Sequence, residues 1–140
     1  MKITICGSQT FCNEMEAAEK YLIEKGFQVF SPELFKTEEW FQENHGRAEL
    51  LRMKPIWTQG QFKKIQDSEA ILIMNHEKKG IKGYFGSNTL MELSVAFFLG
   101  KKIFLLNPID ENHPHFEELS GMELVVLAGD LDNLEKEQNI

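Results

Sequence analysis

The sequence of 140 residues has few of the features that mark membrane, secreted or metal-binding proteins. Its two cysteines, Cys6 and Cys12, are too few for a disulfide framework, and Cys6 lies in an apolar run that is typical of a small buried thiol. The first apolar stretch is too short for a signal sequence or a membrane span. These absences predict a cytoplasmic protein with reduced, structural cysteines and no membrane partner.

Positive charge and cofactor motifs are scarce as well. The chain has 15 Lys and Arg against 22 Asp and Glu, and no stretch gathers five or six basic residues, so a small ligand is favoured over a nucleic acid as partner. No G-x-G-x-x-G motif follows the first predicted strand and no P-loop occurs, which argues against dinucleotide redox chemistry and phosphoryl transfer. His113-Pro114-His115 has no further His or Cys at ligand spacing. We therefore expect neither a metal nor a cofactor.

Apolar residues are plentiful. They make up 42% of the chain, with eleven Phe, which is enough to cover a sheet with helices. The length fits one domain spanning residues 1–140, in which the acidic residues 130–140 form a short terminal helix that frays. We interpret Trp40 and Trp57 as core or interface residues rather than as platforms for base stacking.

Short apolar runs alternate with longer segments of helical periodicity, a pattern typical of βαβ units around a mostly parallel sheet. Apolar residues between the first two strands recur at helical spacing, and Gly26 follows as a cap. A helix or two is expected over residues 37–57, which begin with Thr37-Glu38-Glu39 and include Pro55. Further helices are expected at 58–66 and 88–99. The five predicted strands are Lys2 to Cys6, Phe27 to Phe30, Ala70 to Met74, Lys102 to Leu106 and Glu123 to Leu127.

Polar and small residues follow each predicted strand. In open α/β sheets, ligands bind at the carboxyl ends of the strands, so these residues are candidates for a site that accepts a polar, neutral ligand. The same residue types also end strands and begin turns, and the sequence leaves both interpretations open. The segments are Gly7-Ser8-Gln9, Pro32-Glu33, Asn75, Asn107-Pro108 and Gly129-Asp130.

Glu92 is conspicuous because the stretch from Ser87 to Gly100 contains no other charged residue. On a helical wheel it lies among apolar positions, so it needs a local explanation. One explanation is a capping box, since Thr89 to Glu92 fits S/T-x-x-E. The other is that a carboxylate in the first turn of this helix projects into the strand-end crevice as a nucleophile or general base.

Ser87 and Asn88 also allow two interpretations. Either residue could be an ordinary N-cap of the helix. Alternatively, their side chains and the free backbone amides of the same turn form a site for an anion or a hydroxyl group. A 5'-phosphate would suit the second arrangement.

The residues just described carry a family resemblance. With Gly7-Ser8-Gln9, the strand from Ala70 to Asn75 and the turn and helix from Gly86 to Gly100, the chain resembles the nucleoside 2-deoxyribosyltransferase superfamily, which includes deoxynucleoside 5'-monophosphate N-glycosidases. The similarity extends from the first strand to about Pro108. It is most specific in Gly-x-Asn-Thr-x-x-Glu-x-x-x-Ala followed by Leu-Gly-Lys-Lys-Ile, which begins here at Gly86 and ends at Ile103.

This resemblance implies a fold and an activity. The fold is a Rossmann-like or flavodoxin-like three-layer sandwich with five mostly parallel strands in the order 2-1-3-4-5. The activity is cleavage of an N-glycosidic bond, or glycosyl transfer, on a nucleoside or nucleoside 5'-monophosphate, in which Glu92 attacks the anomeric carbon and forms a covalent glycosyl enzyme. The implied substrate-binding residues are Gly7, Ser8, Gln9, Phe11, Gln61, Asn75, Gly86, Ser87 and Asn88, with Phe11 lying against the base.

The sequence departs from this family at two positions. The family carries an aspartate where this chain has Gln61 and another where it has Gly86. Of the acids that could replace them, Asp67 and Glu69 precede a strand and are remote from the crevice, whereas Glu33 is near a strand's carboxyl end. The alternative is a non-catalytic nucleotide-binding relative that has lost its acid residues. The family's pockets are completed by a neighbouring subunit, which implies a homodimer or higher homo-oligomer.

Overall fold

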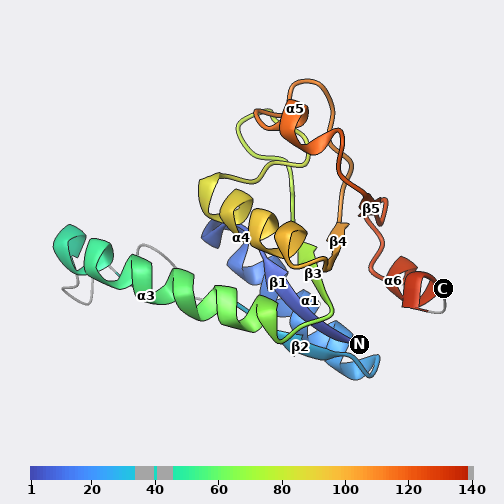
Figure 1. Ribbon diagram of the computed structural model, residues 1–140, viewed down its shortest axis with the longest axis horizontal. Coiled ribbons are helices and arrows are strands. Elements are labelled where there is room, and N and C mark those ends of the chain that lie inside the picture. Colours follow the sequence, from blue (N-terminus) through green and yellow to red (C-terminus); the bar gives the residue numbers. More distant parts are fainter. Residues whose placement is uncertain (34–39, 41–45, 139–140) are drawn as a thin grey trace.

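The computed structural model describes residues 1–33, 40 and 46–138 (Figure 1). Five parallel strands form one sheet in the order β2-β1-β3-β4-β5, which confirms the predicted topology. The chain therefore crosses over from β2 at one edge, past β1, to β3. The strands are β1 (Lys2–Cys6), β2 (Gln28–Phe30), β3 (Ala70–Ile73), β4 (Lys102–Leu105) and β5 (Leu124–Val126).

The strands lie where the sequence predicts them, with small differences at their ends. β3 and β4 each end one residue earlier than expected, although Met74 N still donates to Cys6 O (2.9 Å) and Leu106 N to Ile73 O (3.0 Å). The ladder thus continues one residue beyond the assigned strands. This extension aligns the carboxyl ends of β1, β3 and β4 at one edge of the sheet.

Helices cover both faces of the sheet, as expected for three layers. α1 (Cys12–Glu24) and α6 (Asn133–Gln138) pack on one face, where Met15, Leu22 and Leu134 are fully buried. Against the other face lie α3 (Gly46–Gln66), α4 (Ser87–Phe98) and α5 (Phe116–Leu119). A 3-10 turn, η1 (Gln9–Phe11), precedes α1. Figure 1 shows α3 and α4 side by side, and the far end of α3 projects from the body of the molecule.

The helix between the first two strands is confirmed. Met15, Ala18 and Leu22 form the buried stripe of α1, and Gly26 follows with φ of 95°, a left-handed conformation that glycine adopts without strain. The terminal segment is also helical, but Leu134 is fully buried, which ties α6 to the core.

The predicted division between helices over residues 37–57 and 58–66 is wrong. α3 continues from Gly46 to Gln66 with Pro55 in its interior. A proline removes one backbone hydrogen bond and costs about 3 kcal/mol inside a helix, but the residues before it are strong helix formers and include the Arg52–Glu49 ion pair. The helix start expected at Thr37-Glu38-Glu39 lies outside the described residues. Across the described ranges, no helix is long and apolar enough to span a membrane.

Candidate functional site

A cavity of about 680 Å³ opens at the carboxyl ends of β1 and β2, between α3 and the start of α4. This is where the sequence places its candidate site. Most of the predicted site residues line this cavity, although they come from three separate segments. They are Gly7, Ser8, Gln9, Gln61, Gly86, Ser87, Asn88 and Glu92.

Two predicted substrate-binding residues, Phe11 and Asn75, are not among the lining residues. Phe11 is buried and packs edge-on against the His76 ring, with 5.1 Å between centroids. Asn75 is fully buried and its amide is occupied: Nδ2 donates to Asn107 O (2.7 Å), and Oδ1 accepts from Asn107 N (2.9 Å). Asn75 therefore joins the ends of β3 and β4.

Gly7 opens the loop that forms one wall of the cavity. A Cβ at this position would lie 3.1 Å from Met15 Sδ and 3.4 Å from Met74 O, so a larger residue would push the loop away from the sheet. A hydrogen bond also holds this loop in place: Gln9 Nε2 donates to Glu33 O (2.6 Å), which ties the loop to the segment after β2.

Glu92 lies one turn further into its helix than the sequence suggests. α4 begins at Ser87 with Gly86 as the N-cap residue, so Glu92 is in the second turn, and Thr89 is a buried residue inside the helix rather than a cap. The capping-box interpretation is therefore wrong. Thr89 and Glu92 both line the cavity.

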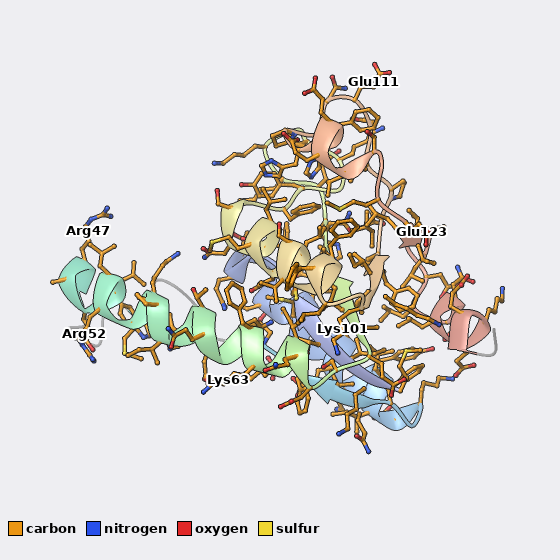
Figure 2. The ribbon with its side chains drawn as sticks, in the orientation of Figure 1. Arg47, Arg52, Lys63, Lys101, Glu111 and Glu123 are labelled. Carbon is orange, nitrogen blue, oxygen red and sulfur yellow. The ribbon has the colours of Figure 1, made fainter. Side chains whose placement is uncertain are left out.

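The surroundings of Glu92 disfavour its charge. Burial raises the pKa of this carboxyl group from its usual 4.5 to about 7, and a hydrogen-bond interaction with the Cys6 thiol opposes part of that rise. Its Oε2 atom is buried and has no hydrogen-bond partner among the residues that the structure describes. Figure 2 shows other charged side chains on the periphery of the molecule, among them Arg47, Glu111 and Glu123.

Gln61, a predicted substrate-binding residue, is 4% exposed. Its Nε2 donates to Ile5 O (2.9 Å) and to Cys6 Sγ (3.7 Å), and these contacts fix which end of the amide is the nitrogen. Its Oε1 is buried, and no residue within the described ranges donates to it. The side chain thus joins α3 to the end of β1 directly below the cavity.

The start of α4 is open. No side chain in the described part of the chain caps it, and the first turn contains no acidic residue. The interpretation of Ser87 or Asn88 as an ordinary N-cap is therefore wrong, because Gly86 holds that position. Both side chains are exposed on the cavity wall, beside backbone amides that carry the positive end of the helix dipole.

The long loop between β3 and α4 closes over the Gly7-Ser8-Gln9 loop. Lys78 Nζ donates to Thr10 Oγ1 (2.8 Å) and lies 3.4 Å from Ser8 Oγ. The same ammonium group lies 5.3 Å from the centre of the Tyr84 ring, a cation–π contact. Lys78 therefore brings a positive charge to hydroxyl groups on the cavity wall.

Sequence reasoning missed several lining residues. Trp57, for which the sequence predicts a core or interface position, lines the cavity. Its ring packs edge-on against that of Trp40, with 5.8 Å between the ring centroids. Tyr84 lines the cavity from the long loop, and a Cβ at Gly86 would lie 3.3 Å from its hydroxyl. The Tyr84 hydroxyl thus fills space that a side chain at position 86 would need. The sequence signals that point to this loop are its length, which is unusual for a βα connection, and its three glycines, Gly80, Gly83 and Gly86.

The acids near the site divide as the sequence suggests. Glu69 stands at the start of β3, where its Oε1 accepts from Lys2 N (3.3 Å), and neither it nor Asp67 lines the cavity. Glu33 lines the cavity but is exposed. Over the described ranges, no group of three or more His, Cys, Asp or Glu is placed to hold a metal ion.

Comparison with known proteins gives a structural likeness. No protein-family model matches the sequence, and no curated protein matches it. Among solved structures, the fold is similar to that of the Clostridium botulinum CMP N-glycosidase BcmB, with a TM-score of 0.52 and 14% identity. The match covers 99% of this chain and 98% of that one. It confirms the five-stranded α/β fold that the family resemblance implies.

Proposed function

We propose that this protein cleaves the N-glycosidic bond of a nucleoside 5'-monophosphate or nucleoside, with Glu92 as the nucleophile. The observation that carries the proposal is a half-buried carboxylate, with its Oε2 atom buried, on the wall of a 680 Å³ cavity at the carboxyl ends of the strands. Small-molecule sites have volumes of about 300 to 1,000 Å³, so a nucleotide is of suitable size. The fold likeness to a CMP N-glycosidase supports the same class of reaction.

The proposed reaction has two steps. A Glu92 carboxylate oxygen forms a bond to the anomeric carbon as the bond from that carbon to the base nitrogen breaks, and the electron pair leaves with the base, which takes up a proton. The sugar passes through a state with oxocarbenium character, and the desolvated carboxylate stabilises its developing positive charge. Water or a second base then attacks the same carbon and releases Glu92.

The proton for the leaving base needs a source, because Gln61 and Gly86 replace the family's aspartates. Among the described residues that line the cavity, Tyr84 carries an exchangeable proton from the side of the long loop, and its hydroxyl lies beside Gly86. We assign the leaving-group proton to Tyr84 within this proposal. Tyr84→Phe tests the assignment: base release should fall about tenfold to a hundredfold with little change in KM.

A 5'-phosphate on the substrate fits the open start of α4. The free amides at Ser87 and Asn88 provide hydrogen-bond donors at the helix start, and the Lys78 ammonium group adds positive charge at the Ser8 and Thr10 hydroxyls of the cavity wall. Glu92 lies about one turn further along the same helix, on the wall of the same cavity. We therefore favour monophosphates over nucleosides as substrates.

A homo-oligomer is part of the proposal. Apolar side chains are exposed on both α3 and α4: Ile56 lies on the cavity wall, and Phe98, at the other end of α4 from the cavity, is 87% exposed. A second copy that covers this face would also shield the open side of the cavity from water. Light scattering on the purified protein measures the stoichiometry, and Phe98→Ser should shift it toward monomer.

A non-catalytic nucleotide-binding protein is the second candidate, and the missing aspartates favour it. The two candidates are separated by incubating the protein with ribo- and deoxyribonucleosides and their monophosphates while free base is followed by chromatography. Base release that is lost in Glu92→Gln supports the enzyme. Saturable binding by calorimetry without release of any base would reject catalysis and leave a binding protein.

A further inference from the structure

Gly60 lies in the interior of α3, on the wall of the cavity. Glycine is a poor residue for the interior of a helix, because it loses more conformational freedom on folding than any other residue. Alanine at the same position makes a helix more stable. A glycine inside a helix therefore needs a reason, either in the packing of the fold or in what the helix faces.

The packing of the described residues gives no such reason. Gly26 and Gly83 have φ of 95° and 66°, which a larger residue adopts only with strain, whereas Gly60 lies within a right-handed helix. A Cβ at Gly83 would lie 2.5 Å from Pro108 O. A Cβ at Gly60 would meet no atom of the described residues within 4 Å outside its own stretch of helix. Alanine would therefore fit here.

The reason lies on the cavity side of α3. Four residues that line the cavity share one face of the helix, at the spacing i, i+3, i+4 and i+7: Trp57, Gly60, Gln61 and Lys64. The Gln61 side chain turns toward β1, where its Nε2 donates to Ile5 O (2.9 Å). Because glycine has only backbone atoms, the cavity reaches the backbone of α3 at Gly60, one helical turn from Trp57.

Bare backbone beside an aromatic side chain suits a flat group. An aromatic ring packs against such a surface with carbon atoms about 3.5 to 4.0 Å apart, and a methyl group in between would prevent that contact. The base is the flat part of a nucleotide. In the proposed binding mode the phosphate lies at the start of α4 and the sugar at Glu92, so the base is the part left for the α3 wall.

We infer that Gly60 is a specificity-determining residue: the nucleobase lies flat against the α3 backbone at Gly60, one turn from Trp57, and the missing side chain sets how closely the base approaches. The identity of the ligand rests on the proposed function, whereas the open backbone on the cavity wall does not. At this position, helix stability and ligand binding are expected to oppose each other.

Gly60→Ala tests this opposition. The variant should raise Tm by about 2 to 4 °C, since alanine is the better helix former. Its methyl group should weaken the binding of adenosine and cytidine 5'-monophosphates about tenfold to a hundredfold, because the base can no longer reach its contact distance. Calorimetry measures Kd, and KM from initial rates replaces it for a monophosphate that releases its base.

Two kinds of competitor show which part of the ligand the methyl group blocks. The free bases adenine and cytosine should bind the variant more weakly, as the monophosphates do. Ribose 5-phosphate has no base and should compete equally well in wild type and variant. Equal weakening of ribose 5-phosphate would place the sugar phosphate at Gly60 and overturn the inference, and unchanged competition by the free bases would overturn it as well.

Gln59→Gly is the matched control, because Gln59 is the neighbouring residue of α3, is exposed and does not line the cavity. It should lower Tm by about 1 to 3 °C and leave every Kd unchanged, which separates helix stability from access to the backbone. A Gly60→Ala variant that melts below wild type would show that the fold itself needs this glycine. That result, or unchanged monophosphate binding, would overturn the inference.

Base-release assays separate this inference from the proposed function. If wild type binds the monophosphates but releases no base, while Gly60→Ala weakens binding and raises Tm, the proposed catalysis is rejected and the base contact at Gly60 remains. If wild type releases base and Gly60→Ala leaves KM unchanged, the enzyme remains and the contact is rejected. A wild-type protein that binds neither monophosphate would reject both.

Discussion

Two regions at the carboxyl ends of the strands differ in whether their buried polar side-chain atoms have hydrogen-bond partners. At the ends of β3 and β4, Asn75 and Asn107 satisfy each other: Asn75 contacts both the backbone N–H and the carbonyl of Asn107, and Asn107 Nδ2 donates to Asn75 O (3.1 Å). At the end of β1, by contrast, Gln61 Oε1 and Glu92 Oε2 are buried without a donor among the residues described.

Hydrogen-bond satisfaction distinguishes side chains that stabilise the fold from side chains available to a ligand more clearly than residue type does. A buried polar atom left without a partner costs about 1 to 3 kcal/mol, so folding alone does not favour such atoms. The asparagine pair closes the sheet edge and leaves no capacity for a ligand. The unpartnered atoms beside the cavity retain capacity, which a substrate can use.

The largest expected effect is the loss of catalysis when Glu92 is replaced. Glu92→Gln removes the nucleophile while keeping the size of the side chain, and base release should fall by at least about 10³-fold. The measurement is initial rates of free base with the preferred monophosphate. Glu24→Gln on α1 is the matched control and should leave the rate unchanged, since Glu24 is exposed on the opposite face.

A fall of less than tenfold in Glu92→Gln would contradict the nucleophile assignment. A covalent adduct offers a second readout: rapid acid quenching followed by mass spectrometry should find a glycosyl group on the peptide that contains Glu92 and none on the variant.

The second prediction concerns the hydrogen bonds between Asn75 and Asn107. Asn75→Ala leaves the Asn107 backbone groups without their partners in the interior, and the free energy of unfolding should fall by about 2 to 4 kcal/mol. Urea denaturation measures the change. Asn112→Ala, an exposed asparagine in the loop after β4, should change stability by less than about 0.5 kcal/mol. Equal effects of the two variants would show that the asparagine pair is not structural.

The third prediction concerns the energetic cost of Glu92 itself. Its pKa is about 7 in the folded protein and 4.5 by its usual value, so the folded state binds the proton more tightly. The resulting stability is fully present below about pH 4.5 and is lost as the pH rises through 7. Glu92→Gln lacks this loss. The free energy of unfolding of the variant relative to wild type should therefore rise by about 2 to 3 kcal/mol between pH 4.5 and pH 8.

Thermal or urea unfolding of both proteins across this pH range provides the measurement. A constant difference between Glu92→Gln and wild type would show that burial does not disfavour the charge. The expected sign is opposite to that of Asn75→Ala, so the two variants together test whether one side of the sheet edge is selected for stability and the other for activity.

The fold was predictable because its signals are local and repeated. Apolar runs fixed β1 and, within a residue or so, the other strands, and the stripe of Met15, Ala18 and Leu22 fixed α1. Pro55 misled because a single proline is a strong local signal, while the helix formers around it act together. Reading the pattern residue by residue does not weigh the combined helix propensity of these neighbours against the cost of one proline.

The site was predictable in location but not in its contacts. Glu92 was conspicuous as a charge on an apolar helix, yet its surroundings depend on Cys6 and Gln61, which are distant in sequence and meet only in the fold. Asn75 shows the reverse problem. Its residue type and strand-end position resemble those of a ligand-binding amide, and only its pairing with Asn107 shows that its hydrogen bonds are already made.

The smallest expected effect tests the open start of α4. Asn88→Asp replaces an amide with a carboxylate in the first turn, where the helix dipole should stabilise it by about 0.3 to 1 kcal/mol. The same charge repels a phosphate and should weaken monophosphate binding about tenfold, with nucleoside binding unchanged. Calorimetry measures both ligands, and Asn112→Asp controls for the added net charge. A variant that gains stability and loses only the phosphate contribution would show that this helix start is left open for an anion; equal weakening for both ligands would place the phosphate elsewhere.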